Sequence, residues 1–219
     1  MKNRLLLALF LVVLLTTFSY QEKTNHFFNY NIKKIEIFNN FLLSEKEIKK
    51  KLVFLYDTNL FFLNSEKIEK ELNNIDFIES FEIKKKYPHS LKIKIFERRP
   101  IAILQNKRNK HYYTDKDNII NFIPHEDLQN LPTIFGNKEN FKIFHEVLKK
   151  INFPINTVKT FYFFESNRWD LVNKKNQTIK LPIEKYEISL INFMDIRQKD
   201  NFRKYKTFDY RIYDQLILK

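Results

Sequence analysis

The sequence predicts an α+β protein, and three patterns along the chain lead to this fold class. A single long hydrophobic run occupies residues 5–20. Residues 31–99 then alternate between strand and helix periodicities in the order β-α-α-β-β. Residues 100–219 carry short strand patterns around two helical ones. We therefore expect one transmembrane helix, a small α+β domain, and a mixed β-domain with helices and a C-terminal edge strand.

The hydrophobic run LLLALFLVVLLTTFSY predicts a single membrane anchor at residues 5–20. Lys2 and Arg4 precede it, so the positive-inside rule leaves residues 1–4 as a cytoplasmic tip and exports the remainder. A helix of this length spans about 24 Å, and snorkelling basic side chains extend it toward the roughly 30 Å of a bilayer core. The alternative is a cleaved signal peptide with a weak small-residue site after Ser19.

Two helices are predicted in the first domain, which follows a polar linker at residues 21–30. Ser44 and Glu47 have the spacing of a capping box, so a helix should start there and continue to about residue 52. Ser65 is expected to cap a second helix that ends near residue 73. The apolar residues expected to face inward are Ile48, Leu52 and Leu55 for the first helix, and Ile68 and Leu72 for the second.

Three strands complete the first domain, at residues 32–38, 77–86 and 91–96. The last two are joined by a turn at Tyr87-Pro88-His89-Ser90. Every second residue of the third strand is apolar, namely Leu91, Ile93 and Ile95. Helices packed on one face of such a small sheet would bury both helical stripes.

The second domain is predicted to begin at residue 100 and to be dominated by short strands. These are expected at 101–104, 110–113, 118–123, 157–164, 169–173 and 177–181, with one or two more within 207–219. Two helices are expected at 141–150 and 183–197. The first would bury Phe141, Phe144, Val147, Leu148 and Ile151, and the second Ile188, Ile191 and Met194. The only glycine, Gly136, is placed at a turn.

The composition excludes several kinds of catalytic site. The 219 residues include no cysteine, so neither a disulfide framework nor a thiolate site can form. One glycine is too few for a phosphate-binding loop, a dinucleotide turn or a nucleophile elbow. His145-Glu146 lacks the second histidine of a zinc protease, and Ile119 and Ile120 interrupt a calcium loop that would begin at Asp115. We therefore expect no cofactor, no metal and no enzymatic activity.

The formal net charge of +13 permits a nucleic-acid interpretation, which we do not favour. Lysine, asparagine, isoleucine and phenylalanine are all abundant and share A/T-rich codons, so base composition accounts for much of the lysine excess. Attraction to anionic lipid headgroups or to an acidic partner fits a membrane-anchored chain better. The basic runs Lys84-Lys85-Lys86 and Arg98-Arg99 are candidates, although a solvated face is the simpler reading.

The order of these segments resembles the FtsQ/DivIB family of bacterial cell-division proteins. A short tip and one anchor come first, and a POTRA-type module and the family's β-domain follow. The shared pieces are the first strand with its Asn39-Asn40 turn, the Tyr87-Pro88 hairpin, Glu97 with Pro100-Ile101-Ala102, Tyr113-Thr114-Asp115, Leu131-Pro132 with Gly136, Arg168-Trp169-Asp170-Leu171, Ile179-Lys180-Leu181-Pro182 and Phe208-Asp209-Tyr210-Arg211. The resemblance implies a POTRA domain at 31–99 and an FtsQ-type β-domain at 100–219.

The chain departs from the family at three turns where glycine is usual. These turns lie at Asn39-Asn40, near Asp117 and near Asn176. Asparagine and aspartate are the best non-glycine residues for a positive φ, so we expect the turns to be kept.

The resemblance also implies a partner-binding edge in the last strand of the β-domain. There, a periplasmic segment of the partner FtsB would add as a further strand. The candidate contacts are Phe208, Tyr210, Arg211, Ile212 and Tyr213, with Arg168 as a further contact for an acidic partner. The alternative is that the aromatic residues pack inward, and Trp169 is expected in the core.

The sequence is compatible with three candidate functions, of which the first is preferred. The first is a non-catalytic division scaffold in the bacterial inner membrane at the division septum. It would bind FtsB- and FtsL-like proteins, and other division proteins, on the periplasmic side, and would help to control septal peptidoglycan synthesis. The second is a chaperone-like POTRA module of outer-membrane protein assembly or secretion, and the third is a periplasmic hydrolase. No motif supports the hydrolase, and we expect neither nucleic acid nor a small-molecule substrate as a partner.

Overall fold

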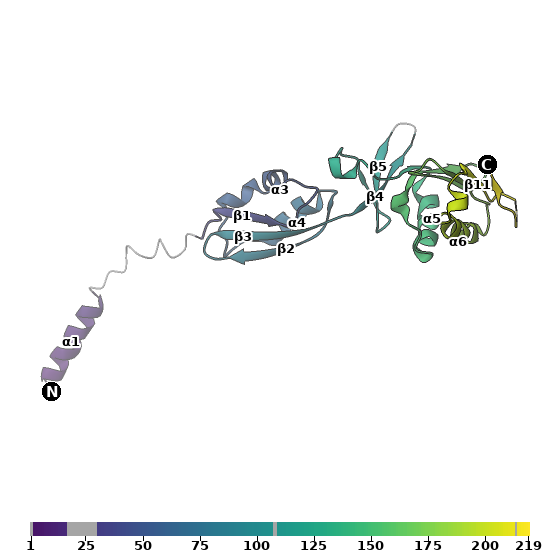
Figure 1. Ribbon diagram of the computed structural model, residues 1–219. Coiled ribbons are helices and arrows are strands. Elements are labelled where there is room, and N and C mark those ends of the chain that lie inside the picture. The colour runs from purple at the N-terminus through teal and green to yellow at the C-terminus, as the bar shows by residue number, and fades with distance from the viewer. Residues whose placement is uncertain (1, 17–29, 107–108, 213) are drawn as a thin grey trace. The chain divides into compact units, whose positions relative to one another are not determined.

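The computed structural model describes residues 2–16, 30–106, 109–212 and 214–219. The end of the predicted anchor, most of the predicted linker and Tyr213 lie outside the described residues. The chain divides into two compact units, Met1–Phe96 and Glu97–Lys219, which are coloured along the chain in Figure 1.

The N-terminal helix α1 (Lys2–Thr16) is apolar around its whole circumference. Ten of its large apolar side chains are 49–76% exposed: Leu5, Leu6, Leu7, Leu9, Phe10, Leu11, Val12, Val13, Leu14 and Leu15. The helix has 15 residues. Within the described ranges, no helix combines the length and the apolar character that a membrane crossing requires.

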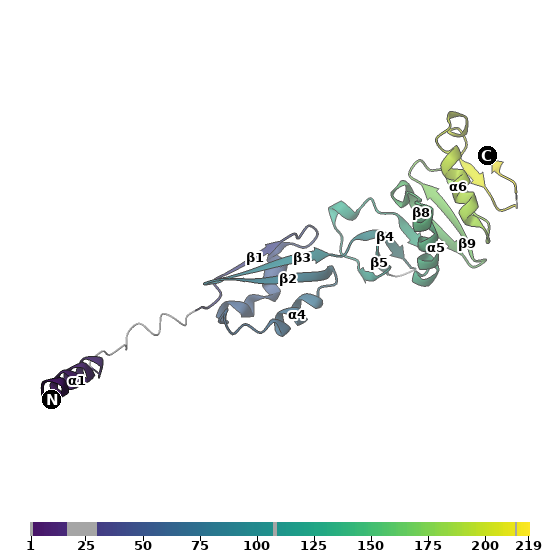
Figure 2. The same cartoon turned by 90° about the horizontal axis from the view of Figure 1, so that it is seen from below.

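The remainder of the first unit has the predicted β-α-α-β-β order. Its elements are β1 (Lys34–Phe38), α3 (Glu45–Lys51), the 3-10 helix η1 (Val53–Asp57), α4 (Ser65–Asn73), β2 (Ile78–Lys86) and β3 (Ser90–Glu97). The strand order is β1-β3-β2, with β1 parallel to β3. Both helices cover one face of this sheet (Figures 1 and 2), and the predicted inward residues of β3 and of both helices are buried. These predictions are confirmed.

Local hydrogen bonds explain where the helices of this unit begin. The Ser44 side chain accepts from the Glu47 amide and the Glu47 carboxylate accepts from the Ser44 amide, which is the predicted capping box. The second helix differs from the prediction, because the side chain of Asn64 rather than Ser65 accepts from the Glu66 amide. Asparagine is as good an N-cap as serine, so the cap lies one residue earlier.

The second unit is built on a nine-stranded mixed sheet in the described part of the chain. Its strands are β4 (Pro100–Gln105), β5 (Lys110–Thr114), β6 (Ile119–Asn121), β7 (Thr133–Phe135), β8 (Val158–Phe164), β9 (Arg168–Asn173), β10 (Thr178–Lys180), β11 (Thr207–Asp209) and β12 (Ile217–Leu218). Their spatial order is β12-β11-β10-β9-β8-β7-β4-β5-β6. Helices α5 (Lys138–Lys150) and α6 (Tyr186–Ile196) pack on this sheet around an aromatic core. Trp169, buried as predicted, stacks on Phe144 with ring centroids 4.8 Å apart.

The predicted inward face of α6 is wrong for two of its three residues, whereas Met194 is partly buried against the core. Ile188 is 61% exposed and Ile191 is also exposed, whereas the buried residues are Leu190, Phe193 and Ile196. The helix is apolar on more than one side, so its periodicity permits two stripes. The Phe193 ring packs edge-on against Phe208 of β11 at 5.1 Å, and this long-range contact selects the stripe that is buried.

The three turns that lack the usual glycine all have the expected backbone conformation. The φ angles are 63° at Asn39, 60° at Asp117 and 58° at Asn176. The Asn39 amide group also donates to the Ile95 carbonyl at 2.8 Å, which ties the first turn to β3. The prediction that asparagine and aspartate keep these turns is confirmed.

Candidate functional site

The C-terminal end of the chain forms one edge of the nine-stranded sheet. Strand β11 pairs in parallel with β10, and β12 turns back to pair antiparallel with β11. Backbone hydrogen bonds in both directions join Thr207 and Lys219, at 3.0 and 3.1 Å. Within the described residues, no strand lies beyond β12.

The pairing of β12 decides which backbone groups face the open edge. Thr207 and Lys219 exchange hydrogen bonds, so the next pair, Phe208 and Leu218, is a non-hydrogen-bonded pair. The amide N–H and carbonyl of Leu218 therefore point away from β11. An added strand would find one donor and one acceptor there.

Six residues of neighbouring strands form a continuous row across the face of the sheet that is opposite the hydrophobic core, and this row ends at β12. Successive strand registers align Phe135, Tyr162, Asp170, Lys180, Asp209 and Ile217, from β7 to β12. We call these six residues the outer row. The rings of Phe135 and Tyr162 are stacked at 5.1 Å, while the three central residues are charged. The neighbouring residues Trp169, Leu171, Ile179 and Phe208 belong to the core on the opposite face.

Two arginines hold the carboxylates of the outer row. The Arg211 guanidinium donates to both carboxylate oxygens of Asp209 at 2.6 to 3.1 Å, and the Arg211 amide donates to the same carboxylate at 3.1 Å. These bonds to Arg211 lower the pKa of Asp209 despite its burial. Arg168 Nε donates to Asp170 at 3.1 Å, and its guanidinium lies 4.6 Å from the centre of the Phe164 ring.

Asp170, like Asp209, is a buried charge of this network. Burial raises its pKa, and the charges of Arg168, Lys180 and Arg211 partly oppose the shift. The structure thus brings the predicted residues Arg168 and Arg211 into one charge network around Asp170. Three members that the sequence analysis did not assign to the site, Asp170, Lys180 and Asp209, join them through strand register. The alternation of residues along one strand does not show which residues of the neighbouring strands lie beside them, so the sequence could not predict this row.

The predicted contact residues divide into two groups. Phe208 is buried against Phe193, and Tyr210 is buried with its hydroxyl donating to Asn192 Oδ1 at 2.9 Å. Burial also raises the pKa of Tyr210. Arg211 and Ile212 are exposed, Ile212 by 50%. Phe208 and Tyr210 therefore support the edge from within, while Arg211 and Ile212 are accessible to a partner.

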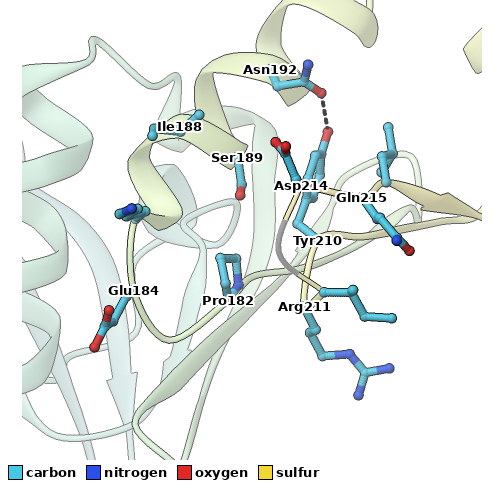
Figure 3. A pocket seen from close by; sticks show the side chains of 12 residues that line it. Pro182, Glu184, Ile188, Ser189, Asn192, Tyr210, Arg211, Asp214 and Gln215 are labelled. Carbon is cyan, nitrogen blue, oxygen red and sulfur yellow. Dashed lines mark hydrogen bonds between the residues drawn. The ribbon is translucent and has the colours of Figure 1, made fainter.

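A pocket of about 470 Å³ lies between helix α6 and residues 210–212 and 214–216 (Figure 3). In Figure 3, Asn192 and Tyr210 point toward each other and share the drawn hydrogen bond. Ile188 of α6 and Ile212 both line the pocket. Exposed Ile188 thus contributes to one wall of the pocket. Among the described side chains, no group of three or more histidine, cysteine, aspartate or glutamate residues is arranged to hold a metal ion.

Comparisons with known proteins give consistent matches. A family profile described as "POTRA domain, FtsQ-type" matches residues 30–98. The "Cell division protein FtsQ" of Rickettsia bellii is 30% identical over 175 residues, which cover 77% of this chain and 64% of that protein. The protein of the same name from Rickettsia typhi is 28% identical, over 70% of this chain and 59% of its own. The chain thus matches less than two thirds of the length of these two relatives.

Two further matches are more distant. The "Cell division protein DivIB" of Bacillus cereus is 26% identical over 105 residues, which cover 48% of this chain and 41% of that protein. Among solved structures, the major extracytoplasmic domain of the cell-division protein DivIB from Geobacillus stearothermophilus aligns with a TM-score of 0.34 and 10% identity, over 51% of this chain and 99% of that one. This structural likeness is too low to carry an argument.

Proposed function

We propose a function from the premise that the chain belongs to the FtsQ/DivIB family of bacterial cell-division proteins. Its role is in cell division. Within that role, we propose a non-catalytic scaffold that binds FtsB- and FtsL-like proteins. It would link early and late division proteins at the septum and help to control septal peptidoglycan synthesis. The relatives are division proteins, so a chaperone role in outer-membrane protein assembly is not favoured.

The proposed location is the inner membrane, with the N-terminus cytoplasmic and the chain that follows the anchor periplasmic. The support is helix α1, whose large apolar side chains are exposed on every side and would be stable in lipid rather than in water. The apolar run continues in the sequence to residue 20, which gives a single-pass anchor at 5–20. The proposed domains are a POTRA domain at 31–99 and a β-domain at 100–219, joined to the anchor by a linker at 21–30.

The observation that carries the scaffold proposal is the open edge of β12. A partner segment in extended conformation would add there as a further strand, using the outward N–H and C=O of Leu218. Ile217 ends the outer row and is exposed enough to contact the added strand, while Arg211 offers a charge to an acidic partner residue. The pocket lined by Ile188 and Ile212 would accept an apolar side chain next to the strand.

The test is the affinity of the full chain, in detergent, for its FtsB–FtsL-like pair. Leu218→Pro removes the outward N–H, and we expect the affinity to fall about tenfold because a partner carbonyl is left unpaired. Leu218→Ala is the matched control, since it trims the side chain but keeps both backbone groups. Equal affinities of the wild type and the folded proline variant would refute the docking edge. Equal losses in the two variants would assign the contact to the side chain instead.

A further inference from the structure

The β-α-α-β-β part of the first unit, which begins at Tyr30 and which we call the POTRA domain, has an aromatic and basic surface at the end where the chain enters it. We call it the tip surface, made of Phe61, Phe62, Lys85, Lys86 and Tyr87. The phenylalanines lie in the loop before α4, and the other three residues lie at the end of β2 and in the following turn. Figure 2 shows the hairpin of β2 and β3 at the same end of the unit as the start of β1.

Hydrogen bonds and ring contacts bring these segments together near Tyr30. The Leu60 amide donates to the Tyr30 carbonyl at 2.7 Å, so the loop runs beside the residue at which the described part of the POTRA domain begins. The Lys85 ammonium donates to the Phe61 carbonyl at 3.2 Å, which links β2 to the same loop. The rings of Tyr30 and Tyr87 meet edge-on at 6.1 Å. Loop, hairpin and chain start therefore form one surface.

The aromatic residues of this surface are not part of the unit's core. Phe61 is 60% exposed, Phe62 75% and Tyr87 53%, whereas Leu60 beside them is fully buried. Phe61 and Phe62 pack edge-on at 5.3 Å, so the pair forms one apolar projection. Lys84, Lys85 and Lys86 are all exposed next to it. Exposed aromatic residues rimmed by charge mark an interaction surface.

The chemistry and the tether favour a lipid surface as the occupant. Aromatic rings seek the boundary between headgroups and hydrocarbon, and lysines are drawn to anionic headgroups. Only residues 17–29 separate α1 from the POTRA domain, and thirteen residues span at most roughly 50 Å. A surface held this close to a bilayer meets it at a high effective concentration.

We propose that the tip surface binds the anionic bilayer in which α1 is anchored, with Phe61 and Phe62 at the headgroup boundary and Lys85 and Lys86 on lipid phosphates. The inference rests on the anchor proposed above. It assigns the POTRA domain a second attachment to the membrane, besides the covalent one. The POTRA domain would then be held against the bilayer by contacts of its own.

The absence of cysteine makes this proposal directly testable, because Phe62→Cys creates a unique labelling site. The full chain, labelled there with an environment-sensitive fluorophore, is reconstituted into vesicles of phosphatidylglycerol mixed with phosphatidylcholine. We expect blue-shifted emission and protection from aqueous acrylamide. Asn73→Cys, at the exposed C-terminal end of α4, is the matched control and should remain accessible to the quencher.

Charge variants test the headgroup contact. Each lysine at an anionic surface contributes about fivefold to binding, so the double variant Lys85→Gln/Lys86→Gln should lower the ratio of docked to undocked protein about 25-fold. Lys70→Gln, on the exposed side of α4, should leave the ratio unchanged. Vesicles of phosphatidylcholine alone should reproduce the double variant's result.

Flotation of the vesicles separates the two possible failures. A chain that does not float with the vesicles would refute the anchor, and the docking inference with it. A chain that floats while the label at position 62 is quenched as strongly as the label at position 73 refutes the docking alone. Protection that arises only after addition of the division partners would assign the tip surface to a protein and overturn the lipid proposal.

Discussion

Replacing Asp117 should strongly destabilise the second unit, because this partly buried carboxylate accepts hydrogen bonds from two buried donors. Its Oδ1 accepts from the Tyr113 hydroxyl at 2.7 Å and from His145 Nδ1 at 2.8 Å. Tyr113 and His145 are almost fully buried. Lys149 approaches Oδ2 at 3.4 Å but is exposed, so its ion pair contributes little.

The expected magnitudes follow from what each substitution leaves unpaired. Asp117→Ala leaves two buried donors without an acceptor, at a cost of about 1–3 kcal/mol each. It also forces alanine to a φ of 60°. We expect a loss of about 4 kcal/mol. Asp117→Asn keeps an acceptor oxygen and tolerates this φ, but it exchanges charged for neutral hydrogen bonds, so the loss should be about 1 kcal/mol.

The assay is urea unfolding of the full chain in detergent at neutral pH, followed by tryptophan fluorescence. Trp169 is the only tryptophan and lies 5.8 Å from the Phe141 ring, which stacks on His145. Asp117→Ala should lower the urea midpoint by about 2 M. Asp200→Ala, at a highly exposed carboxylate, is the control and should change stability by less than about 0.5 kcal/mol. Equal losses for the alanine and asparagine variants would refute the reasoning from unpaired donors.

Three further predictions concern the same unit. Burial lowers the pKa of His145, although its hydrogen bond to Asp117 opposes the shift. Below about pH 6.5 the imidazole is therefore protonated in the unfolded chain while it stays neutral in the folded one. Stability should therefore fall from pH 7 to 5, and His145→Gln should flatten this slope; identical slopes would contradict the buried neutral imidazole. Arg211→Gln should weaken binding of the FtsB–FtsL-like pair about tenfold, whereas Arg203→Gln should not, as measured by titration calorimetry; equal affinities would remove Arg211 from the interface. Gly136→Ala places a Cβ 3.0 Å from Phe163 Cβ and 3.3 Å from Trp169, so thermal unfolding should show a loss of about 1 kcal/mol; an unchanged or raised melting temperature would mean that the two rings relax freely.

The sequence alone predicts the features that arise within a few residues of each other. The alternation of Leu91, Ile93 and Ile95 places β3 and its buried face, and the Ser44–Glu47 spacing marks the start of α3. Asn39 and Asp117 indicate turns with positive φ in place of glycine. Side-chain period, capping and backbone preference are local properties, so they can be recognised without knowledge of the fold.

The tertiary structure decides what depends on segments far apart in the chain. The buried stripe of α6 follows from the contact between Phe193 and Phe208, which the helix pattern does not encode. Asp170, Lys180 and Asp209 become neighbours only through the register of β9, β10 and β11. Strand order also leaves β12 at the edge, with the backbone of Leu218 facing outward. The alternation of side chains along a strand determines which of its residues share a face of the sheet. Only the pairing between distant strands determines which strand lies at the edge and which charged residues lie beside it, accessible to a partner.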